Sequence, residues 1–464
     1  MIDIIKANEL FLREVCVPPI ELNAEDYKLR LHKLVERMNS KGLTHVLIYG
    51  DREHFSNVEY FTRYDCRFEE TLFIVGADGK TSIIVGNEGM GFSTIIPYEI
   101  ERYLYQNFSL QGQPRDKVVP LNSILNEIGI TKQSNIGIVG VKYFEQSFIN
   151  TEPAQTYDLP HYIVGEIEKA CEHICNITDE ITGLPNGIRM VLYTAKEIAW
   201  AEAAGNRTAA VIQRMFKNVK PGMKEYELAE LCQVGFDALN SHPLTNFGSE
   251  SVAIGMGSPR NIELDVGEVC GFSYSIRGNL TSRVGIAAYG SDTCKEELKP
   301  YIDNFYKKYY EGIAAWYETV KVGATGGELY DAVMSLIGGE EFGVTLNPGH
   351  NTGADEWTNS PSYKGSEIPL VSGAFMQVDI IASRKDPVRT AICEDAVVIA
   401  DPSLRKELEE QFPEVYKRIL ERQKVIREVL GIVLHDDVLP MSNLNGVYFP
   451  FMLNREMVFG KRQG

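Results

Sequence analysis

The stretch Asn347-Pro-Gly-His350, followed by Gly373-Ala-Phe-Met-Gln-Val-Asp379 and Arg389-Thr-Ala-Ile-Cys-Glu394, decides the fold and the chemistry of this chain. The last two segments are apolar runs typical of buried β-strands, and each ends at a carboxylate. A glycine turn precedes the histidine. Residues 269–291, upstream, contain no carboxylate at all. A hydrolytic site with two metal ions needs about four or five oxygen and nitrogen ligands, so roughly half of such a set is visible.

Bulk composition excludes several classes of partner. The chain has 464 residues, 44% of them hydrophobic, which predicts at least two domains with sizeable cores. Its formal charge of −18 opposes binding to nucleic acid and to anionic membranes. The eight cysteines are scattered, as in reduced cytoplasmic proteins. Neither a secretory signal nor a membrane-spanning run is expected, so a soluble cytoplasmic protein is predicted.

The pattern of elements predicts an α/β fold in an N-terminal domain and a mixed second domain. A helix at 25–41 and strands at 45–49, 71–75, 81–85 and 135–139 alternate as in an α/β domain. A turn-rich segment at 179–187 marks its end. We therefore expect three parts: an α/β domain over 1–185, a second domain over 186–402, and a C-terminal extension over 403–464.

In the second domain, Thr194 and Glu197 form a capping-box sequence for a long helix. Further elements are predicted as a helix over 225–240, strands within 250–290, helices over 293–320 and 327–337, strands within 341–400, and a charged helix over 402–430. The turns near 219–225 and 322–327 are alike, which suggests an internal duplication. An aromatic-rich tail over 439–453 must pack on its own domain or on a partner subunit.

These segments resemble one family in their order and spacing. Lys196-Glu-Ile198 and Pro221-Gly-Met-Lys-Glu-Tyr-Glu-Leu-Ala229 are similar to the opening of the catalytic domain of creatinases, prolidases and aminopeptidases P, the pita-bread superfamily. Asn347-Pro-Gly-His350, Val378-Asp379 and Arg389–Asp395 resemble that family's histidine and carboxylate segments. The resemblance covers residues 25–400. It implies a creatinase-type N-terminal domain followed by a pita-bread domain, and a homodimer.

The resemblance also implies which ligands are missing. Metal-binding members use two hairpin aspartates, a histidine and two glutamates, and the last three correspond to His350, Asp379 and Glu394. The hairpin corresponds to residues 267–283, where the aspartate positions fall at Ser273 and at Leu280 or a neighbour. Neither side chain replaces a bridging carboxylate, and Asp379 is one methylene shorter than glutamate. We therefore expect no binuclear metal centre and no cofactor.

Creatinase works without a metal, using a histidine that precedes the hairpin. This chain has none in the segment 256–265, and His242 is the upstream candidate. His350 is suited to proton transfer, since its unperturbed pKa lies near 6.5. Asp379 and Glu394 are expected to hold a cationic group or to orient the imidazole. As two neighbouring carboxylates they should also raise one pKa, although Glu394 has a structural alternative in an ion pair with Arg389 or Arg283.

Other side chains are candidates for substrate binding. In creatinase-type dimers a loop of the N-terminal domain closes the partner's site, which implies such a role for Arg63 or Arg67, with a surface role as the alternative. The other candidates for contacts with a substrate are Ser273, Ser275, Arg389 and His242.

Three functions remain open from the sequence. The first is a metal-independent hydrolase or lyase acting on a small polar molecule at a C–N or similar bond, with His350 as acid–base and Asp379 and Glu394 orienting the substrate. The second is a non-catalytic pita-bread protein that binds a small molecule, peptide or protein. The third is a metalloenzyme with a rearranged site that recruits Glu263, Asp265 or Glu268. Cleavage of Xaa-Pro peptides is predicted to be absent.

Overall fold

The computed structural model describes residues 1–232 and 238–462. The chain divides into two compact units, one formed by Leu22–Met190 and the other by Met1–Glu21 together with Val191–Gly464. We call them the insert unit and the main unit. The domain prediction began the first domain at residue 1. The structure instead places residues 1–21 in the main unit, because strand β1 (Ile2–Lys6) pairs with β17 (Met457–Lys461) near the C-terminus.

The insert unit is built on one six-stranded sheet in the order β5-β4-β3-β2-β6-β7. The hairpin predicted over 71–85 is confirmed, since β3 and β4 pair antiparallel, and β2 and β6 pair in parallel as in an α/β domain. Strands β2 to β4 are almost wholly buried because helices cover the sheet. The elements are β2 (His45–Gly50), β3 (Thr71–Gly76), β4 (Thr81–Val85), β5 (Glu101–Leu104), β6 (Asn135–Val139), β7 (His173–Asn176), α2 (Ala24–Ser40), α3 (Ser56–Thr62), α4 (Gly89–Phe92), α5 (Leu121–Ile128), α6 (His161–Ala170) and α7 (Thr178–Thr182).

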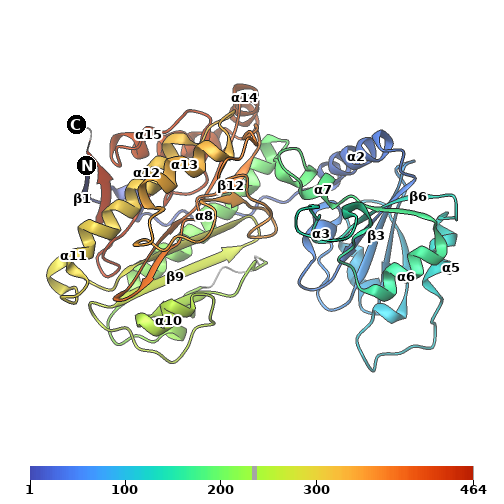
Figure 1. The fold of residues 1–464 in the computed structure, drawn as a ribbon, viewed down its shortest axis with the longest axis horizontal. Coiled ribbons are helices and arrows are strands. Elements are labelled where there is room, and N and C mark those ends of the chain that lie inside the picture. Colours follow the sequence, from blue (N-terminus) through green and yellow to red (C-terminus); the bar gives the residue numbers. More distant parts are fainter. Residues whose placement is uncertain (233–237, 463–464) are drawn as a thin grey trace. The chain divides into compact units, whose positions relative to one another are not determined.

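The main unit holds two further sheets, with strand orders β13-β14-β10-β9-β8 and β11-β12-β15-β16. The long hairpin of β9 and β10 lies at the centre of the first sheet, and α8 packs against it (Figure 1). The strands are β8 (Leu244–Phe247), β9 (Val269–Ile276), β10 (Asn279–Ile286), β11 (His350–Asn351), β12 (Phe375–Gln377), β13 (Ala382–Lys385), β14 (Val388–Glu394), β15 (Ala396–Ile399) and β16 (Val438–Pro440). The helices are α1 (Glu9–Leu12), α8 (Ala195–Asn218), α9 (Glu225–Ala229), α10 (Gly248–Ile254), α11 (Lys299–Tyr301), α12 (Lys308–Thr319), α13 (Gly326–Ile337), α14 (Pro402–Gln411) and α15 (Pro413–Glu428), with a π-helical turn over Ile302–Lys307.

Helix α8 begins as the sequence predicts. The Thr194 hydroxyl accepts from the Glu197 backbone N–H at 3.2 Å, while the Glu197 carboxylate accepts from the Tyr193 N–H, one residue before the N-cap. Its alanine-rich surface allows close packing on the hairpin. Gly278 in the hairpin turn has φ +98° and lies so near Trp200 and Ala204 that a Cβ would meet both, so the turn requires glycine.

Three predicted elements differ in the structure. The helix expected over 225–240 ends at Ala229, residues 233–237 of it lie outside the described chain, and residues 238–240 are not helical. Residues 250–254, expected as strand, belong to helix α10, because the buried Glu225 carboxylate accepts the Phe247 N–H and fixes the start of this helix. The helix expected over 402–430 is two helices, since Pro413 begins a new one.

The two similar turns open helices in the same way. Glu227 accepts the Lys224 N–H at 2.8 Å, and Glu328 accepts the Thr325 N–H at 2.7 Å. Lys224 and Thr325 also each form an isolated β-bridge with a later loop. This likeness supports the predicted duplication of a helix–helix–sheet half.

The aromatic-rich tail packs on its own unit. Strand β16 joins the second sheet, and Tyr448, Phe449 and Phe451 are buried in the core of the main unit. No described helix is long and apolar enough to cross a bilayer. All eight cysteines are free of disulfides.

Candidate active site

His350, Asp379 and Glu394 lie together in the main unit. One ligand-type atom from each lies within 4.8 Å of the others, and among the described residues this is the single such group of histidine, cysteine and carboxylate side chains. His350 is on β11, Asp379 directly follows β12, and Glu394 ends β14. Because β11 pairs with β12 and β14 leads into β15, which pairs with β12, three segments far apart in sequence meet here.

The orientation of His350 is fixed by its two ring nitrogens. Nδ1 lies 3.1 Å from the carbonyl oxygen of Asn351. A carbonyl only accepts, so Nδ1 carries a proton. Nε2 then faces three carboxyl groups: Glu356 at 3.1 Å, Asp379 at 3.8 Å and Glu394 at 3.9 Å. Trp357 stacks on the imidazole with ring centroids 4.1 Å apart. A lone pair on Nε2 would oppose these oxygens, so the position favours a proton or another cation.

The protonation of the cluster follows from burial and from its neighbours. Burial lowers the pKa of His350, but Glu356 and Asp379 outweigh it and leave that pKa above its ordinary value. Burial raises the pKa of Asp379 to about 6, against the opposing effect of His350. Burial and the Asp379 and Glu356 charges raise the pKa of Glu394 well above its ordinary value. Burial and the neighbouring charges therefore oppose full ionisation of the Asp379 and Glu394 carboxyl groups.

Two site residues were not predicted from the sequence. Glu356 lies in the loop after β11, with its Oε1 at 3.1 Å from His350 Nε2, and its nearby charge helps to raise the pKa of Glu394. Gln377 is fully buried, directly opposite His350 on the neighbouring strand. Its Nε2 donates to Glu394 Oε1 at 3.2 Å and to the Leu280 carbonyl at 2.9 Å.

The hairpin face next to Glu394 carries hydroxyl and apolar groups. Ser282 pairs with both Ser273 and Glu394, and Leu280 pairs with Ser275. Side chains alternate along a strand, so these residues face the same side of the sheet. The Ser273 and Ser282 hydroxyls are 2.6 Å apart, and Ser275 bonds to the Asn279 carbonyl at 3.4 Å. Ser273 and Ser275 are thus placed on the site's face of the sheet.

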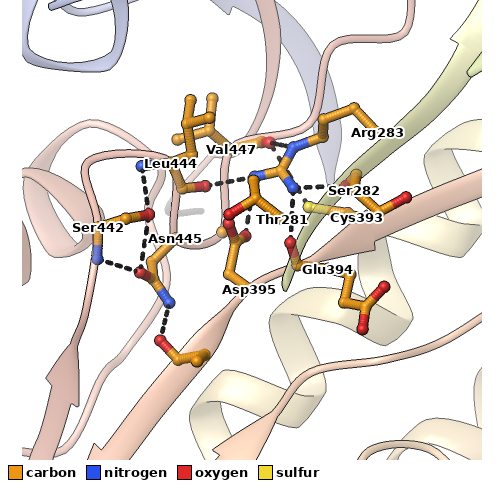
Figure 2. A network of polar contacts seen from close by, with 12 residues as sticks. Thr281, Ser282, Arg283, Cys393, Glu394, Asp395, Ser442, Leu444, Asn445 and Val447 are labelled. Carbon is orange, nitrogen blue, oxygen red and sulfur yellow. Dashed lines mark hydrogen bonds and ion pairs between the residues drawn. The ribbon is translucent and has the colours of Figure 1, made fainter. Parts of the chain in front are cut away.

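Arg283 holds the backbone of Glu394 without contacting its carboxylate. The fully buried guanidinium donates to the Glu394 carbonyl at 2.9 Å and pairs with Asp395 at 2.8 Å. It also donates to the carbonyls of Ser282, Leu444 and Val447. Figure 2 shows the Glu394 carboxylate directed away from this network. The structural alternative for Glu394, an ion pair with Arg283, is therefore wrong.

Arg389 does not reach the cluster. It lies five residues before Glu394 on β14, which places it on the opposite face of the strand. Its guanidinium stacks over Tyr301 at 4.0 Å and donates to the carbonyls of Asp386 and Pro387. The role of Arg389 is therefore structural, because its Nη1 group is engaged by the adjacent turn.

The remaining predicted residues are found elsewhere. His242 is exposed in the loop before β8. In the insert unit, Arg63 ends α3 with a left-handed backbone, φ 65°. Arg67 pairs with Asp65 at 3.3 Å and, with Tyr64 and other residues, lines a pocket of about 240 Å³.

The donor set fits one metal ion and not two. Imidazole and carboxylates are suitable ligands for one divalent cation, and the buried Nε2 of His350 and Oδ1 of Asp379 have no hydrogen-bond partner. A second ion would need carboxylates on the hairpin face, where Ser273 and Leu280 stand instead. The carboxylates considered for a rearranged metal site do not belong to this cluster. Glu268 pairs with Lys295, and neither Glu263 nor Asp265 is among the clustered ligand-type residues.

Comparisons with known proteins agree with this architecture. Residues 199–401 match the model of metallopeptidase family M24. The fold is similar to that of the Xaa-Pro dipeptidase from Bacillus anthracis (TM-score 0.60, 14% identity, covering 81% of this chain and 96% of that one). It is also similar to a recombinant prolidase from Thermococcus sibiricus (0.62, 18%, 81% and 95%). A third similar structure is the N-terminal domain of the FACT complex subunit SPT16 from chickpea (0.56, 12%, 82% and 95%). No curated protein matches.

The protein therefore has the mixed α/β pita-bread fold of the creatinase, prolidase and aminopeptidase P superfamily. Within that fold, residues 199–401 are the part of the chain that matches the metallopeptidase family M24 model.

Proposed function

We propose that this protein is a metal-independent hydrolase that cleaves a C–N bond in a small polar molecule. One observation carries the proposal: His350 Nε2 faces Glu356, Asp379 and Glu394, while the hairpin face beside them presents Ser273 and Leu280. This arrangement offers acid–base groups without the carboxylates that would bridge two ions.

The proton transfers follow from the geometry. Because Nδ1 of His350 donates to the Asn351 carbonyl, the exchangeable proton is on Nε2. The raised pKa of His350 keeps that proton in place at neutral pH, so the imidazolium acts as general acid. Asp379, with a pKa of about 6, accepts the proton of the attacking water. The water oxygen bonds to carbon, the C–N bond breaks, and the leaving nitrogen takes the Nε2 proton.

A second candidate is a hydrolase with one divalent ion held by His350, Asp379 and Glu394. It is favoured by the 4.8 Å spacing of their ligand atoms and by the unpartnered His350 Nε2 and Asp379 Oδ1. A bound ion would supply a Lewis acid and an activated water. A non-catalytic binding protein is the third possibility, supported by the same loss of hairpin carboxylates.

The test is turnover of a panel of small amides, lactams and amidines, measured with and without EDTA, together with metal analysis of the purified protein. We expect EDTA-resistant turnover that His350→Ala reduces by about 10²-fold or more. His242→Ala, a change at an exposed histidine, should leave turnover unchanged. Loss of activity in EDTA with one ion per chain would replace the proposal by the second candidate. Binding without turnover would replace it by the third, and hydrolysis of an Xaa-Pro dipeptide would contradict the predicted absence of peptidase activity.

A homodimer in the cytoplasm remains a prediction. Sedimentation of the purified protein tests the dimer. A single species of about 52 kDa, the mass of one chain, would contradict it.

A further inference from the structure

A pocket of about 240 Å³ lies in the insert unit, between the loop that precedes β3 and helix α4. The residues that line it all fall between Tyr64 and Phe92 and belong to the insert unit. The cluster of His350, Asp379 and Glu394 belongs to the main unit instead. The pocket is therefore a feature of the insert unit alone, and its chemistry can be read from its own wall.

Tyr64 brings a hydroxyl group without a hydrogen-bond partner to this pocket. The residue is only 2% exposed, and its hydroxyl forms no hydrogen bond with any residue that the structure describes. A Cβ at Gly89 would lie 2.8 Å from the hydroxyl oxygen, so the oxygen lies against the part of the wall that Gly89 forms. Burial raises the pKa of Tyr64 above its ordinary value, so the hydroxyl keeps its proton at neutral pH. The pocket thus presents a phenol O–H donor that lacks an acceptor.

The carboxylates of the wall are already engaged. The buried Glu69 carboxylate accepts from the Glu88 backbone N–H at 3.0 Å and from the Gly89 N–H at 2.9 Å. Glu88 in turn accepts from the Gln113 side-chain amide at 2.8 Å. Because Glu69 takes both N–H groups, the start of helix α4 offers neither of them to a ligand.

The charges around the pocket favour an uncharged ligand. The wall contains two carboxylates, Glu69 and Glu88, and one guanidinium, Arg67, which is itself paired with Asp65 at 3.3 Å. An anion would face an excess of negative charge there. A cation bearing only N–H donors would leave the Tyr64 proton without an acceptor. A neutral ligand with an acceptor oxygen meets both conditions.

The rest of the wall is aromatic. The Tyr64 and Phe92 rings lie 5.3 Å apart, and the Arg67 guanidinium lies over Phe92 at 5.7 Å. Phe68 lines the pocket while 60% exposed, which places an apolar side chain where the pocket meets solvent. A cavity of about 150 Å³ holds benzene, so the 240 Å³ of this pocket has room for a benzene ring with a small substituent.

We propose that this pocket of the insert unit binds a small uncharged aromatic carbonyl compound. The carbonyl oxygen accepts a hydrogen bond from the Tyr64 hydroxyl, and the ring packs against Phe92 and Phe68. The inference goes beyond the proposed function, because none of these residues takes part in the proton transfers assigned to the main unit.

The test uses acetophenone and three matched probes on the full chain, with dissociation constants measured by saturation-transfer NMR. Acetophenone has no C–N bond, so its binding is read independently of any hydrolysis. Cumene replaces the carbonyl oxygen by a methyl group, benzoate carries a negative charge at the same place, and benzylammonium carries a positive one. We expect acetophenone to bind at least about tenfold more tightly than benzoate, because burying an unpaired anion beside carboxylates is costly. It should also bind more tightly than benzylammonium, which has no acceptor for the Tyr64 proton.

Two variants then assign the site. Tyr64→Phe removes only the hydroxyl, and it should weaken acetophenone by about fivefold while cumene binds no more weakly than before. Gly89→Ala adds a Cβ that would lie 2.8 Å from the Tyr64 oxygen, and it should weaken acetophenone by about tenfold or more. Gly91→Ala is the matched control, since a Cβ at this position of the same helix meets nothing within 4 Å. Circular dichroism verifies the fold of each variant, and Tyr64→Phe alone decides the question if Gly89→Ala does not fold.

The inference is overturned if acetophenone does not bind, if a charged probe binds more tightly, or if Tyr64→Phe weakens acetophenone and cumene equally or not at all. An equal loss in Gly89→Ala and Gly91→Ala would also overturn it. Its failure is separable from that of the proposed function. Acetophenone binding without turnover of any amide, lactam or amidine would keep this site and remove the hydrolase, and turnover without acetophenone binding would do the reverse.

Discussion

Replacing Arg283 by methionine should destabilise the main unit and loosen the candidate site. The guanidinium is fully buried, pairs with Asp395 at 2.8 Å, and donates to four backbone carbonyls, including that of Glu394 at 2.9 Å. Removing one partner of a buried ion pair costs about 3–5 kcal/mol, because the other charge stays buried. The orphaned carbonyls add to this, so we expect a loss of at least about 4 kcal/mol, a large part of the usual 5–15 kcal/mol.

Urea unfolding followed by circular dichroism measures this loss. Since the chain has two compact units, the transition of the main unit should shift while that of the insert unit stays in place. Arg384→Met, at an exposed position on β13, should change stability by less than about 0.5 kcal/mol. Adding Asp395→Leu to Arg283→Met should recover part of the loss, because the buried charge is then removed too. A loss below about 1 kcal/mol, or an equal loss in Arg384→Met, would refute the reasoning.

Three further predictions concern charge and packing. The pKa of Asp379 is about 6 in the folded protein and about 3.9 in an unfolded chain. Ionisation of Asp379 therefore destabilises the folded protein, and this destabilisation grows as the pH rises from about 4 to about 6. Asp379→Asn should thus stabilise the protein by roughly 3 kcal/mol at pH 8 and by little at pH 4, and equal effects at both pH values in urea unfolding would contradict this. His350 has a raised pKa, so its stabilising contribution is present below about pH 6.5 and is lost as the pH rises through the folded value. His350→Gln should accordingly cost more stability at pH 6 than at pH 9, and a pH-independent cost would contradict this. Glu202 accepts from Arg418 and Arg422 at 2.7 Å, and Glu202→Gln should lower thermal stability by about 3 kcal/mol, whereas an unchanged melting temperature would show that the pair is dispensable.

His350, Asp379 and Glu394 could be predicted from the sequence because the pattern that marks each of them lies in the residues directly beside it. His350, Asp379 and Glu394 each follow a glycine turn or end an apolar run, and apolar runs that end at a carboxylate tend to be core strands. Which strands pair depends on the tertiary fold: β11 and β15 both pair with β12, and Glu394 ends the strand that leads into β15. The order of the motifs carried this information.

The missed residues divide into two kinds. Gln377 stands two positions before Asp379, so strand alternation alone puts both on one face, and this signal was available. Glu356 lies in a loop without periodicity, and only the folded path of that loop brings it to His350. Arg389 was predicted as a site residue although it does not reach the cluster. It is close to Glu394 in sequence, but an odd number of strand residues separates the two, so their side chains lie on opposite faces of β14.

The pairing of β1 with β17 has a consequence for the order of folding. Ile2 lies opposite Lys461, so β1 finds its partner only after every residue between the two strands has been synthesised. Residues 22–190 form their own sheet and can fold while the rest is still emerging from the ribosome. Strand β1 must remain unpaired by β17 during that time, and the main unit then closes a contact between segments that are far apart in the sequence. Contacts of such long sequence separation form slowly, so the closure of the terminal strands is expected to be a late event in folding.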